Sequence, residues 1–196
     1  LALQTAQALS ALFRAVACHV EFLTEALDDF VDESSLIFFL KANLVNKPKQ
    51  LATGLNLSRQ DLLLDKNGLW RLVESNSIAA GMGPFCEALR QIQTSYFANP
   101  EKDLPANPAT VQIAQHLFDA AFKQHNNANP MIIFVVVENE DNIHDQNKIA
   151  SALIQLGARV IRKTFKQLSE QLTATDQKEL VIEKNIVDCF YFRTGY

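Results

Sequence analysis

The sequence lacks the features typical of secreted, membrane-spanning and disulfide-stabilised proteins. Its three cysteines, Cys18, Cys86 and Cys189, are odd in number and far apart, which argues against a disulfide framework and against metal-knuckle spacing. The longest apolar runs, such as residues 131–137, fall far short of the roughly 18 residues that a membrane helix needs. The first residues carry no signal-peptide pattern. We therefore expect a cytoplasmic protein with reduced thiols.

An excess of positive charge is also missing. Lys and Arg number 18 against 22 Asp and Glu, giving a net charge of -4, so we expect neither nucleic acid nor a membrane as a partner. The 196 residues, 48% of them hydrophobic, suit one α/β body or one domain plus part of another. The chain begins with Leu1 rather than methionine and stops after a strand-like run at residues 186–192, so we expect a fragment of a longer protein.

The amino-terminal part reads as helical. Residues 1–47 contain neither glycine nor proline, and apolar residues recur every three to four positions. This spacing predicts one long amphipathic helix. Ser34 and Ser35 are expected to cap a second helix, which must end before Pro48.

The middle of the chain carries turn signals. Asn67-Gly68 lies between two short apolar runs, which predicts a β-hairpin because both turn positions favour positive φ. Pro84 is suited to the first turn of a helix that extends to about residue 97. A connector rich in proline and asparagine, residues 99–108, leads to a further amphipathic helix.

The last third of the chain alternates between strand and helix patterns. A β-branched run at residues 131–137, a helical segment at 143–156 and a second strand at 158–164 predict a βαβ unit, usually parallel. The predicted fold class is therefore α/β: helices and a hairpin in residues 1–129, then a βαβ lobe with a mainly parallel sheet in residues 130–196.

A carboxylate and an amide end the second hairpin strand. Glu74 and Asn76 are two apart, so their side chains are expected on the same face, as hard oxygen ligands suited to Mg²⁺. A solvated strand end would look the same. The following small-residue segment, residues 78–83, could present backbone amides to an anionic group, although a plain tight turn explains it equally well. It matches neither the Walker nor the dinucleotide-binding pattern.

Polar residues also gather after the first strand of the βαβ unit, where α/β sheets bind ligands. Glu140, Asp141, Asn142 and Gln146 could hold an amino or carboxylate group. Alternatively, Asp141 or Asn142 caps the helix.

Two arginines are candidate carboxylate clamps. Arg193 follows a strand-like run, and Arg59 precedes the hairpin; the alternatives are an arginine that snorkels beside tyrosines and a surface charge. No arrangement of Ser-His-Asp or Cys-His type is visible, which argues against a hydrolase.

Five segments in this order resemble eukaryotic-type glutathione synthetase, an ATP-grasp ligase. The spacing between them is also similar to that family, and together they cover nearly the whole chain. The segments are residues 57–61, 73–83, 140–146, 160–165 and 191–196.

The resemblance implies an ATP- and Mg²⁺-dependent ligation of γ-glutamylcysteine to glycine through an acyl phosphate, in a cytoplasmic homodimer. It implies that Glu74 and Asn76 bind Mg²⁺ and that Glu74 also lies against the ATP phosphates. It places no catalytic residue in this segment. The implied substrate-binding residues are Arg59, Ile78, Ala79, Ala80, Gly81, Glu140, Asp141, Asn142, Gln146, Arg193, Thr194, Gly195 and Tyr196.

Departures from the family pattern leave alternatives open. Ala79 and Gly81 stand where the family usually carries serines, Met82 also departs from its pattern, and Thr194 replaces an aspartate, which puts the exact peptide in doubt. The remaining family elements for nucleotide and glycine would lie beyond Tyr196, so we expect this segment alone to be inactive. The alternatives are a non-catalytic peptide-binding or interaction module and a related ligase that uses β-alanine.

Overall fold

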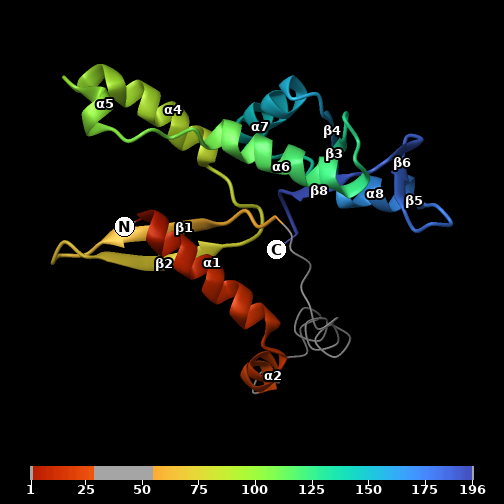
Figure 1. Cartoon of the computed structure of the whole chain (residues 1–196), viewed down its shortest axis with the longest axis horizontal. Helices are drawn as coiled ribbons and strands as arrows, with labels where there is room; N and C mark the ends of the chain where they lie inside the picture. The colour runs from red at the N-terminus through yellow and green to blue at the C-terminus, as the bar shows by residue number, and fades with distance from the viewer. Residues whose placement is uncertain (1, 29–54, 196) are drawn as a thin grey trace. The chain divides into compact units, whose positions relative to one another are not determined.

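The computed structural model describes residues 2–28 and 55–195 (Figure 1). The chain forms two compact units, Leu1–Gly54 and Leu55–Tyr196, which are described separately. The predicted helix near Ser34 lies outside the described residues. Among the residues described, no helix is both long enough and apolar enough to cross a membrane.

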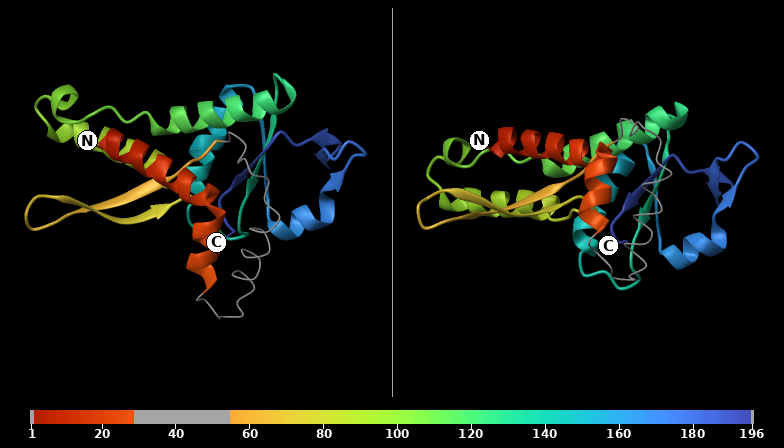
Figure 2. Two further views of the ribbon diagram at one scale, coloured as in Figure 1. Left: turned by 60° about the horizontal axis from the view of Figure 1, so that its bottom comes forward. Right: turned by 90° about the horizontal axis from the view of Figure 1, so that it is seen from below.

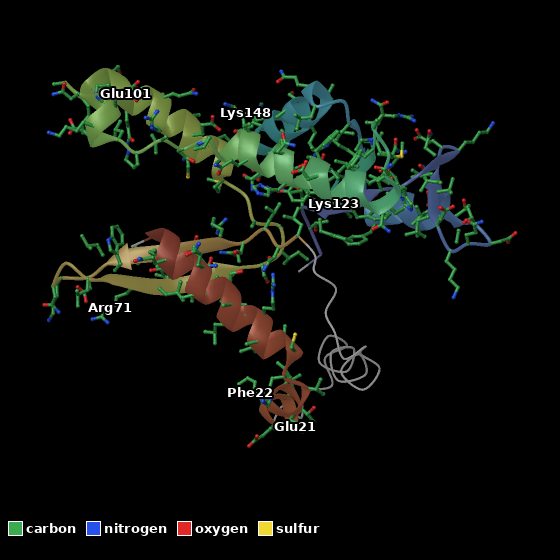
Figure 3. All side chains as sticks on the ribbon, in the orientation of Figure 1. Glu21, Phe22, Arg71, Glu101, Lys123 and Lys148 are labelled. Atoms are coloured by element: carbon green, nitrogen blue, oxygen red, sulfur yellow. The ribbon has the colours of Figure 1, made fainter. Side chains whose placement is uncertain are left out.

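The first unit contains two helices where the sequence predicts one. Helix α1 spans Ala2–Cys18 and α2 spans Val20–Asp28, so the prediction of one continuous helix is wrong. The break falls at His19, whose Nδ1 accepts a hydrogen bond from the backbone N–H of Phe22 at 3.0 Å. The imidazole thus caps α2. Glu21 in the first turn places a negative charge near the positive end of the helix dipole, which stabilises the helix (Figure 3).

The second unit begins with the predicted hairpin. Strands β1 (Arg59–Leu64) and β2 (Trp70–Asn76) pair antiparallel. The connecting loop differs from the two-residue turn with two positive φ angles, because Gly68 has φ 75° while Asn67 is not in the positive region. Instead, the Asp65 carboxylate accepts from the backbone N–H groups of Asn67 and Leu69 at 2.8 and 2.9 Å, which closes a wider loop.

A helical segment follows the hairpin. Helix α4 (Gly83–Gln93) has a proline in its first turn, as predicted, and leads into the short 3₁₀ helix η1 (Thr94–Tyr96) and α5 (Pro100–Asp103). Helix α6 (Ala109–His125) carries Ala114, Leu117 and Ala121 on its buried face.

A parallel sheet forms the core of the second unit. Strands β4 (Arg159–Lys163) and β8 (Cys189–Phe192) lie on either side of β3 (Met131–Val135), and both pair parallel to it. Helix α7 (Ile143–Gln155) connects β3 to β4, as predicted, and Gly157 after it has φ 99°. The predicted α/β fold class is therefore confirmed; the domain boundary at residue 129 stays a prediction.

Both faces of this sheet are covered, which explains why all five residues of β3 are buried. Alternate residues of β3, among them Ile132 and Phe134, pack with α6 and α7. The others, including Ile133, pack with Leu168 of α8 (Phe165–Gln171) and with Ile182. Figure 2 shows α6 and α7 on one side of the sheet and α8 on the other.

The segment predicted as one strand at residues 186–192 is two strands in different sheets. A small antiparallel sheet contains β5 (Thr173–Ala174), β6 (Leu180–Ile182) and β7 (Asn185–Ile186). Between β7 and β8 lies the buried Asp188, whose carboxylate accepts from the backbone N–H of Met131 at 2.7 Å and lies 2.8 Å from His125 Nδ1. This carboxylate fastens the end of α6 to the beginning of β3.

Candidate functional site

Four polar side chains share one face of the hairpin. Asp61 lies opposite Glu74 and Arg59 lies opposite Asn76, and residues two apart on a strand face the same side. Asn76 Nδ2 donates to Glu74 Oε1 at 3.0 Å and to Asp61 Oδ2 at 3.4 Å. We call Arg59, Asp61, Glu74 and Asn76 the hairpin polar cluster.

Arg59 balances the charge of this cluster. Its Nε and Nη2 donate to the two carboxylate oxygens of Asp61 at 2.7 and 2.8 Å, and Nη2 lies 3.6 Å from Glu74 Oε1. This bidentate pair holds the pKa of Asp61 below its usual value. Carboxylates directly opposite each other in a sheet repel, and Arg59 offsets that repulsion.

A β-bulge sets the position of the cluster. Asp61 pairs with Glu74, but Leu62 pairs with Leu72, so Val73 is one extra residue on β2. Bulges re-aim side chains and are frequent next to active sites. Here the bulge brings Glu74 opposite Asp61. If the pairing continued from Leu62 and Leu72 without a bulge, Val73 would lie opposite Asp61 instead.

The cluster is chemically suited to a magnesium ion. Mg²⁺ prefers carboxylate and amide oxygens and commonly takes one or two protein ligands, with phosphate oxygens and water completing its shell. The carboxylates of Glu74 and Asp61 supply such oxygens. Asn76 directs its Nδ2 towards both of them, so its Oδ1 would join them only with the amide turned over. Groups of three or more His, Cys, Asp or Glu side chains able to hold a metal are not found among the described residues, so any metal bound here would need ligands from outside them.

The loop after the hairpin takes a strained path. Ala79 and Met82 have φ 51° and 75°, a region that non-glycine residues rarely adopt and that clusters at functional sites. Gly81 serves a different purpose: a Cβ at this position would lie 2.7 Å from Arg193 Nη2. The glycine therefore makes room for the arginine.

Arg193 is buried and held from three directions. Its Nη1 donates to the backbone carbonyl of Ala80 at 2.8 Å and to the Tyr191 hydroxyl at 3.1 Å, and Nη2 donates to Asp145 Oδ2 at 3.3 Å. Asp145 lies in the first turn of α7 and is fully buried. Arg193 thus joins the loop after the hairpin to the parallel sheet and to α7.

These elements enclose a cavity of about 450 Å³. Polar and small residues from the hairpin, from the loop after it, from the segment after β3 and from the end of β8 line it. Its lining includes seven of the residues predicted to bind ligands: Arg59, Asn76, Ile78, Ala79, Glu140, Asn142 and Arg193.

The other predicted residues that the structure describes do not line this cavity; they include Glu74, Ala80 and Gly81. Gln146 is fully buried beside Asp145, whereas Asp141 is exposed. Thr194 and Gly195 follow Arg193, and Tyr196 lies outside the described residues. Asn142 occupies the cap position of α7, as the alternative interpretation allowed, but its side chain makes no capping hydrogen bond within the described chain. Asn142 lines the cavity instead.

Three residues of the candidate site were not predicted from the sequence. Asp61 and Asp145 lie beside residues that were singled out, and Tyr191 supports Arg193. All three lie within the five segments that resemble glutathione synthetase. Tyr191 and Arg193 are two residues apart, so strand spacing could have placed their side chains on the same face. The partner of Asp145 depends on a contact between residues 48 positions apart, for which the sequence gives no local signal.

The fold is α/β, and the cavity has polar groups at the carboxyl end of a parallel sheet. Residues 130–196 match the family model of eukaryotic glutathione synthase. The human glutathione synthetase is 24% identical over 201 residues, covering 94% of this chain and 41% of the human protein. The chloroplastic enzyme of Arabidopsis thaliana is 25% identical over 183 residues, covering 88% of this chain and 33% of its own length.

Two further proteins are similar to this chain, one in sequence and one in fold. The chloroplastic glutathione synthetase of Solanum lycopersicum is 29% identical over 162 residues, covering 78% of this chain and 29% of its own. A glutathione synthetase-like effector of Globodera pallida in its apo form has a similar fold, with a TM-score of 0.63 at 14% identity over 72% of this chain and 37% of the effector. The resemblance to eukaryotic-type glutathione synthetase is thus confirmed, and this chain spans between about a third and two-fifths of the length of these human and Arabidopsis relatives.

Proposed function

We propose that this chain forms the γ-glutamylcysteine site and part of the magnesium site of a glutathione synthetase. The observation that carries the proposal is one cavity lined by Arg59 and Asn76 of the hairpin polar cluster together with Glu140, Asn142 and Arg193. At one end of the cavity, Glu74 and Asp61 lie next to Asn76 and supply carboxylate oxygens for a cation. The other end offers groups that recognise an amino acid.

The residues of the hairpin polar cluster would work on the reactive end of the dipeptide. Glu74 and Asn76 would hold Mg²⁺, with Glu74 lying towards the nucleotide. When bound, Mg²⁺ and ATP supply charge neutralisation and the phosphoryl group that activates the cysteinyl carboxylate for attack by glycine. Arg59 would orient this carboxylate, and its pairing with Asp61 keeps the guanidinium in place.

The loop after the hairpin would contribute its backbone rather than side chains. Ile78 and Ala79 line the cavity, and the carbonyl of Ala80 is already used by Arg193. Glu140, Asn142 and Gln146 would bind the amino-acid end of the dipeptide, with Asp141, Thr194, Gly195 and Tyr196 beside them. A cytoplasmic location and a homodimer accompany this proposal as predictions from the family resemblance.

Calorimetry on this chain tests the proposal directly. γ-Glutamylcysteine should bind this chain. In a protein that also contains the rest of the ligase, Mg²⁺ with a non-hydrolysable ATP analogue should tighten that binding. Glutathione formation by a protein containing the rest of the ligase, with glycine and β-alanine compared, then tests the reaction and its acceptor. Binding of the dipeptide unaffected by Mg²⁺ and nucleotide would favour the non-catalytic binding module, and no binding would refute the proposed site.

A further inference from the structure

Buried polar atoms without a hydrogen-bond partner in the described chain gather near the first turn of α7. Gln146 lies next to Asp145, and Asp145 contacts Arg193, which lines the cavity together with Glu140. Arg162 on β4 lies near the same residues. Burial has the largest effect on the pKa of Arg162, and Glu140 and Arg193 are the charged side chains that also shift it. The atoms are Glu140 Oε2, Asp145 Oδ1, Gln146 Oε1 and Nε2, Arg162 Nη1 and Arg193 Nε.

Strand register brings the two arginines to the same face of the sheet. Arg162 pairs with Phe134 on the middle strand, and Phe134 pairs with Tyr191 on β8. The rings of Phe134 and Tyr191 touch edge to face with their centroids 5.0 Å apart, and Arg193 follows two residues after Tyr191. Arg162 and Arg193 therefore lie on the same face, on and just after the two outer strands. Arg193 lines the cavity, and Arg162 lies behind Glu140 and Arg193.

This arrangement is unfavourable for the fold alone. Burial lowers the pKa of the Arg162 guanidinium, Glu140 raises it and Arg193 lowers it again, so the charged form is opposed by desolvation and by a second cation. A buried donor without a partner also destabilises the folded chain. Val160, on the same face of β4, packs against the apolar core, and an apolar residue at position 162 would avoid both penalties. Such local conflicts are typical of binding sites.

The unpaired atoms match one kind of chemical group. Arg162 Nη1, Arg193 Nε and Gln146 Nε2 are donors suited to a carboxylate, while Glu140 Oε2 and Asp145 Oδ1 are acceptors suited to an ammonium. A carboxylate and an ammonium on one carbon form the head of an α-amino acid. In γ-glutamylcysteine only the glutamyl residue has this head, because the cysteinyl amine is in the peptide bond.

We propose that Arg162 binds the α-carboxylate of the glutamyl residue and so selects dipeptides that carry it. The inference rests on the proposed function and adds a residue to it. The glutamyl head would lie beyond the carboxyl end of β3, with Arg162 of β4 on one side and Arg193 after β8 on the other. The cysteinyl carboxylate would face the hairpin polar cluster at the other end of the cavity.

A calorimetric comparison of two ligands tests this assignment on the full chain. The ligands are γ-glutamylcysteine and γ-aminobutyrylcysteine, which is the same molecule without the glutamyl α-carboxylate. In Arg162→Met we expect a dissociation constant raised roughly 10- to 100-fold for γ-glutamylcysteine, as for a lost charge-assisted hydrogen bond, and unchanged for γ-aminobutyrylcysteine. Lys166→Gln, which removes one exposed positive charge on α8, should change neither constant.

Each outcome decides the inference. Unchanged binding of γ-glutamylcysteine in Arg162→Met, or equal losses for both ligands, overturns the role of Arg162 while the proposed function stands. Failure of the unmodified chain to bind γ-glutamylcysteine overturns the proposed function and this inference with it. Thermal unfolding should show Arg162→Met at least as stable as the unmodified chain. If that variant does not fold, Arg162→Lys makes the same comparison, and a loss of about threefold or more confined to γ-glutamylcysteine is the result that supports the role.

Discussion

The parallel sheet and the hairpin hold their shapes by different means. All five residues of β3 are buried between two layers, whereas Leu63 and Trp70 of the hairpin are 65% and 58% exposed. Burial of apolar side chains stabilises the sheet. The hairpin depends on the Asp65 loop and on the hairpin polar cluster, and an isolated two-stranded hairpin is marginally stable. Substitutions in the sheet should therefore change stability, and substitutions in the hairpin should change chemistry.

The largest effect should come from the centre of the sheet. Phe134→Ala removes a fully buried ring, and we expect the free energy of unfolding to fall by about 3–5 kcal/mol in urea denaturation. Leu63→Ala on the exposed hairpin is the control, with an expected change within roughly 0.5 kcal/mol. Similar losses for the two variants would remove the distinction between the regions.

A second substitution tests the chemical role of the hairpin. In the proposed ligase, Glu74→Gln should lower kcat by at least about 100-fold, because a carboxylate that would hold the charge-neutralising Mg²⁺ is lost. Unfolding in urea should stay unchanged. Asp65→Asn removes a carboxylate from the far end of the same hairpin and should keep near-normal kcat. Near-normal turnover of Glu74→Gln with unaltered Mg²⁺ dependence would refute the metal assignment.

The connection between the two regions is tested at Gly81. Gly81→Ala places a methyl group against Arg193, and we expect a loss of roughly 1–3 kcal/mol in stability together with weaker γ-glutamylcysteine binding. Gly68→Ala introduces strain at φ 75° in open space and should destabilise by about 1 kcal/mol. Calorimetry should find ligand affinity unchanged in the Gly68 variant; weakening of equal size in both would mean that the contact with Arg193 is unimportant.

The smallest effect should appear in acid. Arg59 lowers the pKa of Asp61, so the stabilisation from this pair is complete above the pKa of the unfolded chain, near about 4, and is lost as the pH falls through the lower folded pKa. Trp70 is the sole tryptophan and lies on β2, so its fluorescence reports on the hairpin. Asp61→Asn should reduce the fluorescence change below pH 4. The change that remains is due to Asp65, because the hydrogen bond from the Leu69 amide also lowers the pKa of that carboxylate. An unaltered acid transition would argue against the pair.

The sequence predicts those parts of the molecule that depend on local patterns. The run of β-branched residues in β3 indicates a buried strand, and the spacing of Glu74 and Asn76 places them on one face. Contacts between distant segments are different. The pairing of Asp61 with Glu74 depends on a bulge at Val73 that no local signal marks, and Asp145 meets Arg193 only once the sheet has formed. The cap at His19 was missed because histidine is not among the common capping residues.

Arg71 illustrates the same limit on the hairpin. Figure 3 shows it on the part of the hairpin near the loop, where its Nε donates to the Asp65 carboxylate at 2.9 Å. The turn signal at Asn67-Gly68 correctly predicts that two strands meet here. It does not indicate that an aspartate side chain, rather than two residues with positive φ, closes the loop.

The hydrogen bond from Arg193 to Ala80 joins residues 113 positions apart. During synthesis on a ribosome, β1, β2 and the loop that follows them emerge long before β8 is made. The loop can be anchored only after β8 has docked beside β3, so the cavity is completed at the end of folding. Contacts of such long sequence separation form slowly. A nascent chain that ends before Arg193 would have the residues of the hairpin polar cluster but no means of fixing them above the sheet.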